Sequence, residues 1–510
     1  MLSFEYETVN TINVDEIQKM KKLLNTSSDF VAGKIHWTYL LTPQLMTEIA
    51  CNCGVLYDMK STKYNPFFIA ILYLLFNNLV YEKNEGDFFQ YDQTTGLWHA
   101  TTAQVLVTKI QHFVMELDYS SWGLDSFPAC DYGFCERILR ILKGYAEQEN
   151  IFVRPKDKHF VHTKNTMLEY SPEENKWLPC DFSPDYKSRN RTDIEYKPEA
   201  QAPRFFAELL KPAMSDDDIE TLQLYVGQVL LGVNLSQRLL MITGTAGGGK
   251  STLVNVIEQL ISRVNCTQLR MEDGSNRFET SRYVGKTLLT AKDVNSQFLN
   301  HRHAGCLKAL TGGDILSVEY KGSNMQTDIT GVFNVVIVSN STLQLRTDND
   351  VEAWRRRLLW IKYHRTPTKH PIADFDKLLI ETEGSGILNW ALEGARKLLE
   401  NKGKIYPSKA QAARIEELLD NADPLLTYVK KHLIPAENAN MTTEEIWNYF
   451  SRYCHSKEVP MCKKSVFLHV LPDIMEQEHS LCCRNDIKRN GKAKRGYAGI
   501  TLNCQNQSNL

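Results

Sequence analysis

A glycine-rich segment near the middle of the 510-residue chain contains the residue types that surround a phosphate group in proteins. It matches the pattern G-x-x-x-x-G-K-[ST] and, with one following threonine, comprises Gly244, Thr245, Ala246, Gly247, Gly248, Gly249, Lys250, Ser251 and Thr252. Glycines let backbone N–H groups turn towards phosphate oxygens, the lysine reaches the β- and γ-phosphates, and the serine hydroxyl ligates Mg²⁺. An apolar, strand-like run at 239–243 precedes the segment, and the apolar positions of 253–264 share one helical face. This context favours a site for a nucleoside triphosphate, expected to be ATP with Mg²⁺, over a chance glycine-rich turn.

Two later strands are expected to end in polar side chains that complete this site. The strand at 286–291 leads into Lys292 and Asp293, and a carboxylate in this position holds Mg²⁺ beside the phosphate loop, here together with Ser251. The apolar strand at 332–339 is followed by Asn340, whose amide can sense the γ-phosphate or position the attacking water. The alternative for Asp293 is a solvated strand end.

Three consecutive arginines, Arg355, Arg356 and Arg357, precede a strand expected at 358–363. Such a cluster is either a solvated basic turn or the source of an arginine finger. An arginine finger reaches the nucleotide of a neighbouring subunit and stabilises charge in the transition state.

The order of these motifs resembles that of the superfamily 3 helicases, a branch of the AAA+ ring ATPases found in viruses, phages and plasmids. Residues 307–322 are similar to the family segment that leads into a β-hairpin in the channel of the ring, and Lys321 matches the lysine that contacts the DNA backbone. Alignment with the finger of the family favours Arg356, with Arg355 second. These roles are implied by the resemblance.

The resemblance extends over roughly residues 60 to 400 and points to the phage and plasmid primase-helicases. Residues 88–99 are expected to form a hairpin with Gly96 at its turn. The segments that look like the module preceding the helicase, and the helical segment following it, are 91–98, 162–165, 182–184, 202–205 and 386–394. Larger family members carry an N-terminal primase domain, but residues 1–85 are too short for one. We expect no primer synthesis by this chain alone and a separately encoded primase as a possible partner.

Lys292 departs from the family pattern, in which the carboxylate strand ends in two adjacent acids, one for Mg²⁺ and one for water activation. Either Asp293 serves both roles, or another carboxylate such as Asp314 or Glu319 substitutes, or hydrolysis is slow. The sequence leaves these alternatives open.

Cations are concentrated near the C-terminus, after two expected helices that begin near residues 442 and 463. The basic stretch contains Arg484, Lys488, Arg489, Lys492, Lys494 and Arg495. Gly491 indicates a turn within it and 497–502 a returning strand, which together outline a winged helix. DNA binding by this stretch is favoured over a solubilising basic tail.

Composition excludes several broad classes of protein. Lys plus Arg number 59 against 61 for Asp plus Glu, a net charge of −2, so the chain lacks a uniformly basic coat, although a local basic groove is compatible with this balance. The most apolar run, 67–76, is too short to span a bilayer and is expected to be a buried helix. No signal peptide is visible, so we expect a bacterial or host cytoplasm, reduced thiols for the 12 cysteines and no membrane partner. Only Cys51, Cys53, Cys130 and Cys135 have an arrangement that could resemble a zinc site, and buried thiols are favoured.

These elements predict an α/β protein with a central AAA+ P-loop ATPase domain, an α+β N-terminal module, helical flanks and a C-terminal winged-helix-like domain. The expected parts are 1–60 (no assigned role), 61–203 (N-terminal module), 204–236 (helical collar or linker), 237–365 (ATPase core), 366–435 (helical segment) and 436–510 (winged-helix-like domain).

The resemblance implies a DNA helicase that hydrolyses ATP. It would form a homo-oligomeric ring, expected to be a hexamer, move 3′ to 5′ on single-stranded DNA and open forked DNA during replication of a phage, plasmid or mobile element. The alternative is a DNA-binding replication initiator that uses nucleotide as an assembly switch, which Lys292 favours. A small-molecule kinase or GTPase fits poorly, because no N-K-x-D signature occurs and the segment at 307–322 would have no role.

Overall fold

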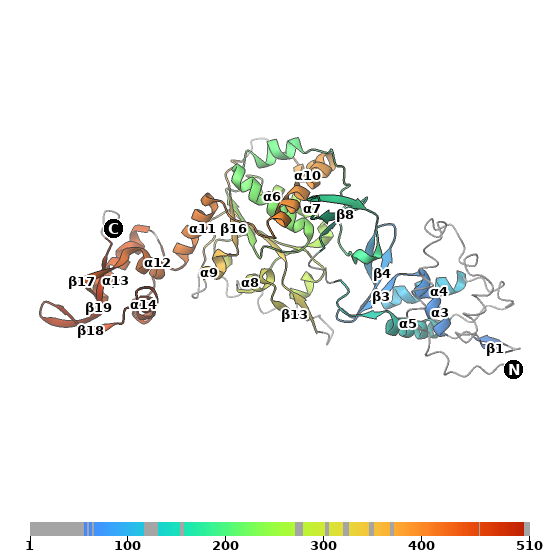
Figure 1. Cartoon of the computed structure of the whole chain (residues 1–510), viewed down its shortest axis with the longest axis horizontal. Coiled ribbons are helices and arrows are strands. Elements are labelled where there is room, and N and C mark those ends of the chain that lie inside the picture. Colours follow the sequence, from blue (N-terminus) through green and yellow to red (C-terminus); the bar gives the residue numbers. More distant parts are fainter. Residues whose placement is uncertain are drawn as a thin grey trace. The chain divides into compact units, whose positions relative to one another are not determined.

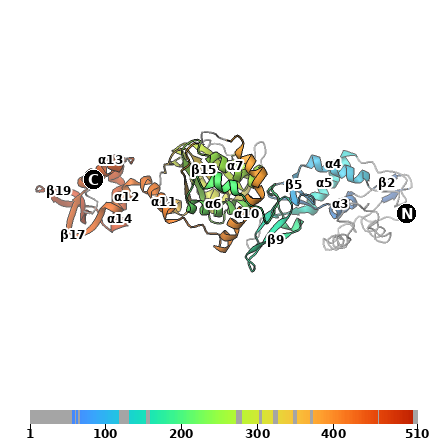
Figure 2. The same cartoon turned by 90° about the horizontal axis from the view of Figure 1, so that it is seen from above.

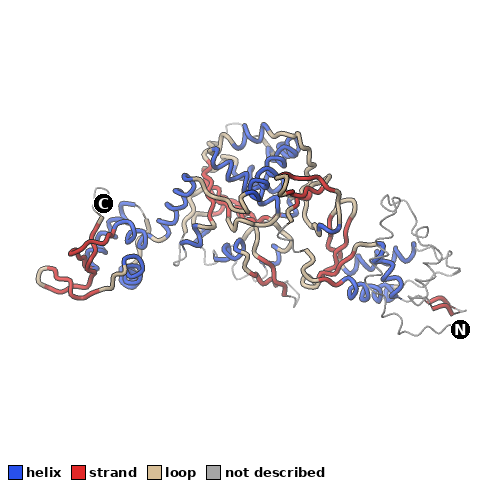
Figure 3. The backbone as a smooth tube through the Cα atoms, in the orientation of Figure 1, coloured by secondary structure: helices blue, strands red, loops and turns tan. Residues whose placement is uncertain are grey.

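The computed structural model describes residues 56–58, 61–63, 66–116, 131–152, 158–270, 279–300, 305–319, 326–345, 351–367, 372–457 and 459–503. These residues form a mixed α/β protein, in which helices and strands alternate along most of the chain (Figures 1 and 3). The chain forms two compact units, Met1–Tyr170 with Leu178–Arg191 and Ser171–Trp177 with Thr192–Leu510. None of the described helices is both long enough and apolar enough to pass through a bilayer.

The first unit combines a helical cluster with two small sheets. Its helices are α3 (Pro66–Phe76), α4 (Ala103–Glu116) and α5 (Tyr132–Ala146). One sheet has the order β5-β4-β3-β6, and its strands are β3 (Leu79–Glu82), β4 (Asp87–Asp92), β5 (Leu97–Thr101) and β6 (Glu147–Gln148). The other has the order β7-β8-β9, with β7 (Phe160–His162), β8 (Met167–Ser171) and β9 (Lys176–Cys180). A separate pair is formed by β1 (Leu56–Asp58) and β2 (Ser61–Lys63).

Two expectations about this unit are confirmed. The apolar run at 67–76 is the buried helix α3, which packs with α4 and α5 around Leu72, Ile110 and Ile138. Strands β4 and β5 form the expected antiparallel hairpin, and Gly96 has a φ of +70° at its turn.

Residues of the motifs that resemble the N-terminal module meet at this hairpin. A Cβ atom on Gly96 would lie 2.7 Å from Phe182, so only glycine fits there. His162 Nε2 lies 3.0 Å from the Thr95 carbonyl oxygen, and Trp98 Nε1 donates a 3.0 Å hydrogen bond to the Pro184 carbonyl. These motif residues therefore hold the fold of the unit together.

The second unit is built on a five-stranded parallel sheet with the order β11-β12-β15-β10-β16. Its strands are β10 (Leu239–Gly244), β11 (Cys266–Gln268), β12 (Leu288–Val294), β15 (Asn334–Ser339) and β16 (Leu358–Tyr363). Four of them lie where the sequence predicts strands, and β12 continues through Lys292 and Asp293. The central strands are buried along most of their length, as a parallel sheet covered on both faces requires.

Helices cover both faces of this sheet (Figures 1 and 2). The helices of this region are α6 (Asp216–Leu231), α7 (Lys250–Leu260), α8 (Gly305–Gly312), α9 (Val351–Arg355), α10 (Phe375–Glu400) and α11 (Lys409–Ala422). Side chains of α8, α9 and α11 join one core with alternate strand residues such as Met241 and Ile337. Helix α10 packs along α6 and α7. A separate antiparallel pair follows α8, formed by β13 (Ile315–Glu319) and β14 (Gln326–Thr330).

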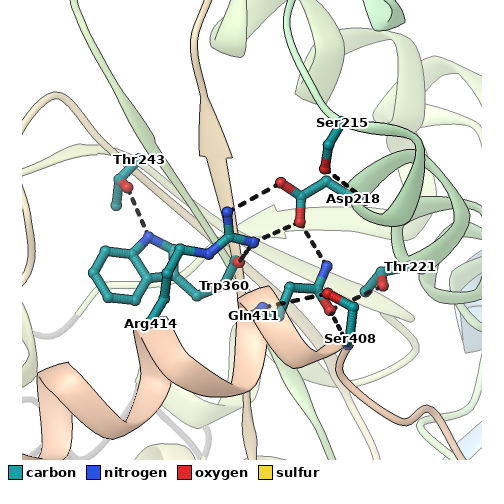
Figure 4. A network of polar contacts seen from close by, with 8 residues as sticks. All are labelled: Ser215, Asp218, Thr221, Thr243, Trp360, Ser408, Gln411 and Arg414. Carbon is teal, nitrogen blue, oxygen red and sulfur yellow. Dashed lines mark hydrogen bonds and ion pairs between the residues drawn. The ribbon is translucent and has the colours of Figure 1, made fainter.

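A buried polar network joins α6, β16 and α11 (Figure 4). Asp218 is 1% exposed and accepts 2.6 Å hydrogen bonds from Arg414 and from Gln411. Arg414 also donates to the carbonyl of Trp360, whose indole N–H donates to Thr243 in β10. Because a buried charge is stable only when it is paired and hydrogen-bonded, the network fixes α11 against the sheet.

The C-terminal part of the second unit has its own core. Its elements are α12 (Pro424–His432), β17 (Leu433–Thr442), α13 (Thr443–Lys457), α14 (Lys464–His479), β18 (Arg484–Arg489) and β19 (Lys492–Leu502), and the sheet order is β17-β19-β18. Both expected helices, the turn at Gly491 and the returning strand are confirmed.

Candidate functional site

The glycine-rich segment connects the end of β10 to the start of α7. Gly247 and Gly249 have φ values of +75° and +98°, a conformation that side chains with a Cβ rarely adopt. Gly249 is the residue that precedes the first turn of α7, so the positive end of the helix dipole points at the loop. The local backbone is therefore that of an anion site.

Lys250 is buried, and its ammonium group is held by three acceptors. Its Nζ donates to the carbonyl oxygens of Gly244 at 2.8 Å and Thr245 at 2.7 Å, and to Oδ1 of Asn340 at 2.9 Å. Burial lowers the pKa of Lys250 from its usual value, while the charge of Asp293 acts in the opposite direction. All three donors of the ammonium group are thus engaged, so a phosphate must exchange with one of these acceptors.

Asn340 and Asp293 lie beside this lysine, as the sequence predicts. The Asn340 amide, directly after β15, also donates a 3.3 Å hydrogen bond from Nδ2 to Oδ1 of Asp293. Asp293 is exposed and has a φ of +54°, and the pairing of β12 with β15 shifts register between Ala291 and Val294. Residues from three parallel strands therefore meet at the carboxyl edge of the sheet, where ligands bind in open α/β sheets.

Lys292 points in a different direction, towards α7. Its Nζ donates to Oε2 of Glu258 at 2.8 Å and to Oδ1 of Asn255 at 2.7 Å. The other oxygen of Glu258 accepts a 2.8 Å hydrogen bond from Thr290. Lys292 is therefore the partner of a mostly buried carboxylate. Asp314 and Glu319 lie at the two ends of β13, outside the hydrogen-bonded cluster around Lys250.

The three consecutive arginines have three different environments. Arg355 donates to both carboxylate oxygens of Glu416 in α11, at 2.6 and 2.9 Å, and pairs with Glu352. The hydrogen bonds that it donates to these carboxylates raise the pKa of Arg355. Arg357 is buried and donates to the Ala353 carbonyl at 3.1 Å. Arg356 is exposed and, among the residues that the structure describes, its guanidinium has no ion-pair partner. Of the two candidates for an arginine finger, Arg355 and Arg356, only Arg356 is exposed and unpaired with a carboxylate of the described residues.

The segment 363–367, which the sequence did not single out, packs directly on the phosphate loop. A Cβ atom on Gly244 would lie 2.2 Å from the Tyr363 carbonyl oxygen, and one on Gly248 would lie 2.7 Å from that of Arg365. Arg365 NH1 donates to the Glu208 carbonyl at 2.7 Å and lies 3.9 Å from the position of a Cβ on Gly249. Arg365 thus places a further cation beside the phosphate loop. The contact between 363–367 and the glycine-rich loop follows from strand pairing, because β16 pairs with β10 and places Tyr363 opposite Gly244.

Four of the six cations of the C-terminal basic stretch are bound to side chains of the same chain, three of them to acids. Arg489 pairs with Glu445 at 2.8 Å, Lys494 with Glu444 at 2.9 Å, and Arg484 with Asp486. The Nε of Arg495 donates to Sγ of Cys483 at 3.0 Å. Lys488 and Lys492 are exposed, and neither forms an ion pair within the described residues. The expected DNA-contacting residue Lys321 lies outside the described residues.

The cysteine arrangement considered for zinc is only partly described. Cys51, Cys53 and Cys130 lie outside the described residues, and Cys135 is buried in the core of α3, α4 and α5. Within the part of the chain that the structure describes, no group of three or more His, Cys, Asp or Glu side chains could hold a metal ion.

Comparisons with known proteins give one family match and several structural likenesses. The profile of DUF5906, a family of unknown function, matches residues 242–357. No curated protein matches the chain. "The A form apo structure of NrS-1 C terminal region-CTR" is 12% identical with a TM-score of 0.47, covering 85% of this chain and 100% of that one. "The apo structure of NrS-1 C terminal region (305-718)" is 11% identical with a TM-score of 0.48, covering 86% and 100%.

Proposed function

We propose that the chain is an ATP-dependent DNA helicase of the superfamily 3, AAA+ type. The observation that carries this proposal is the meeting of Lys250, Asn340 and Asp293 at the carboxyl edge of a parallel sheet, beside a glycine loop at a helix N-terminus. This arrangement supports roles as a phosphate loop, a Mg²⁺ carboxylate and a residue that senses the γ-phosphate. The motif order, rather than the site alone, points to a helicase.

The residues present fit ATP and Mg²⁺. The loop glycines allow the backbone N–H groups to turn towards phosphate oxygens. Lys250 would give up one carbonyl acceptor and donate to a phosphate oxygen in its place. Ser251, whose side chain is exposed, and Asp293 would hold Mg²⁺, which neutralises charge that develops on the phosphates. Asn340, held between Lys250 and Asp293, would orient the attacking water, and Arg365 would add positive charge from the same subunit.

Assembly supplies the remaining cation in this proposal. Arg356 would reach the nucleotide of a neighbouring subunit in a homo-oligomer, with a hexamer and 3′ to 5′ movement implied by the resemblance. Arg355 is less suited, because it would first have to leave Glu416.

Nucleic acid would be contacted by Lys321 in the ring channel and by the C-terminal part. The element order α12-β17-α13-α14-β18-β19 and the sheet order β17-β19-β18 support a winged helix, in which the β18–β19 hairpin would be the wing. Lys488 and Lys492 are the wing cations with no carboxylate partner among the described residues, so they are the residues available to phosphates. The setting would be replication of a phage, plasmid or mobile element, with a separately encoded primase.

One experiment tests this proposal. ATP hydrolysis is measured with and without single-stranded DNA, together with displacement of a labelled strand, for the wild type and Lys250→Ala. We expect DNA-stimulated hydrolysis and unwinding, both lowered about a hundredfold or more by Lys250→Ala. Lys402→Ala, an exposed lysine after α10, is the matched control. Absence of hydrolysis in the wild type would contradict the helicase proposal.

A second candidate is a nucleotide-switched replication initiator with weak or no hydrolysis. The observation in its favour is Lys292, which stands where the family has the first of two adjacent acids and whose ammonium is bound to Glu258. Nucleotide-dependent assembly and DNA binding without turnover would support this candidate over the first.

A further inference from the structure

Helices α3 and α5 of the first unit border a shallow hollow of about 360 Å³ that is largely open to solvent. It is lined by Phe67 from α3 and by Arg140, Ile141, Gly144 and Tyr145 from α5. This volume is at the small end of the range of ligand sites and suits one flat ring rather than an extended molecule.

The hollow is open because of two residues on successive positions of α5. A Cβ atom on Gly144 would meet no atom within 4 Å, so the missing side chain leaves space. Tyr145 is 38% exposed and is one of the lining residues. Glycine inside a helix costs roughly 0.5–1 kcal/mol relative to alanine. Gly144 therefore leaves this side of the hollow open at some cost to the stability of α5.

Cations are concentrated along the same helix. Arg137, Arg140 and Lys143 are exposed, and Glu136 is the acid that accompanies them within α5. Arg137 lies over the ring of Phe134 and Lys143 over that of Tyr81, at 5.7 and 4.4 Å from the ring centroids. None of the three cations pairs with a carboxylate of the described residues, in contrast to the paired cations of the C-terminal hairpin. Arg140 thus lines an otherwise apolar hollow, and Arg137 and Lys143 lie within three residues of a lining residue on the same helix.

We propose that this hollow binds one base of single-stranded nucleic acid, which stacks on Tyr145 while Arg140 and Arg137 contact the neighbouring phosphates. An aromatic surface beside cations is the combination with which proteins bind single strands without reading their sequence. An apolar protein side chain would use the hollow but not the cations, and a duplex would use the cations but not the hollow. The proposal rests on the proposed function only in taking nucleic acid as the ligand. Binding at this hollow requires neither ATP nor unwinding.

Photocrosslinking tests the site directly on the full chain without nucleotide. The probe is a short oligothymidylate in which one position is 5-bromodeoxyuridine, and the crosslinked peptide is identified by mass spectrometry. We expect a crosslink within residues 140–145. Gly144→Leu, which fills the hollow from a position that a side chain can enter, should lower its yield at least fivefold.

Matched variants on the same helix separate stacking from fold. Tyr145→Ala should weaken binding of the oligonucleotide about fivefold or more, whereas Tyr132→Ala, which removes a tyrosine 62% exposed and outside the hollow, should leave it unchanged. Arg140→Ala should reduce the slope of log Kd against log salt by about 0.7. Thermal unfolding of each variant is measured alongside.

Two results would each overturn the proposal. The first is a crosslink that maps only outside residues 140–145. The second is a folded Tyr145→Ala variant that binds the oligonucleotide with wild-type affinity. Stronger binding of duplex than of single strands, with equal loss in both tyrosine variants, also overturns it. A chain that crosslinks at 140–145 but hydrolyses no ATP would contradict the helicase proposal alone.

Discussion

The phosphate loop and the C-terminal hairpin both place cations where the sequence predicts them, yet the two regions use these cations differently. Lys250 is buried and joined to Asn340 and Asp293 by hydrogen bonds that cross three strands. In the hairpin, six cations lie close in sequence, but four of them are bound by Asp486, Glu445, Glu444 and Cys483. Motif spacing on parallel strands therefore predicts which residues meet, whereas a count of charges does not predict which charges are available.

The largest expected effect tests whether the loop is rigid. Gly244→Ala would place a Cβ 2.2 Å from the backbone oxygen of Tyr363, so the pairing of β10 with β16 must shift. We expect a loss of about 3 kcal/mol in the free energy of unfolding, measured by urea denaturation. Gly305→Ala, where a Cβ meets no atom within 4 Å, is the control and should change stability little. Equal stability of the two variants would show that the segment 363–367 does not constrain the loop.

The next effect concerns Lys292, which stands where superfamily 3 helicases have the first of two adjacent acids. Lys292→Glu would set a carboxylate against Glu258 in a mostly buried position, and we expect a loss of about 2 kcal/mol. Lys292→Met, which removes the charge and keeps the length, should lose less. If Lys292→Glu instead raises the rate of ATP hydrolysis with unchanged stability, the side chain at 292 reaches the nucleotide.

A smaller effect separates available from paired cations in the hairpin. Lys492→Ala should reduce the slope of log Kd against log salt for duplex DNA by about 0.9, with a several-fold loss of affinity. Lys494→Ala removes a lysine already bound to Glu444 and should change the slope less. Fluorescence anisotropy over a range of salt concentrations measures both. Equal slopes for the two variants would remove the distinction between these cations.

The smallest effect is a dependence of stability on pH. A hydrogen bond from Arg489 lowers the pKa of Glu445, so its pair stabilises the fold above the ordinary glutamate value of about 4.3 and this contribution is lost as pH falls through the lowered pKa. Because both side chains are about one-third exposed, we expect Glu445→Gln to cost less than 1 kcal/mol at pH 7. The difference from the wild type should shrink as the pH falls below the ordinary glutamate value. A constant difference from pH 7 to pH 3 would show that the carboxylate charge is not involved.

Strand order explains how much of the site the sequence could predict. Apolar runs of strand length, each ending in a polar residue, placed Lys250, Asp293 and Asn340 at one edge of the sheet. The partner of Lys292 could not be predicted, because it depends on the side of the sheet to which this side chain points and on how α7 packs on that side. Arg365 was missed for a related reason: its role follows from the adjacency of β10 and β16, which no local pattern shows.

The C-terminal fold was predictable to a similar degree, and its electrostatics were not. Helix starts, the Gly491 turn and the returning strand follow from local chemistry. The pairing of Arg489 with Glu445 joins a strand to a helix 44 residues away in sequence, so it depends on tertiary structure.

The pair of Lys292 and Glu258 also constrains how such a chain can diverge. An acid in place of Lys292 would be tolerated only if position 258 also lost its negative charge, because Glu258 has no other cation beside it in the described structure. Related chains should therefore show linked substitutions at the two positions. A chain with lysine at position 292 should have glutamate at position 258, and a chain with an acid at position 292 should have a neutral residue at position 258. A search for two adjacent acids would overlook the first group.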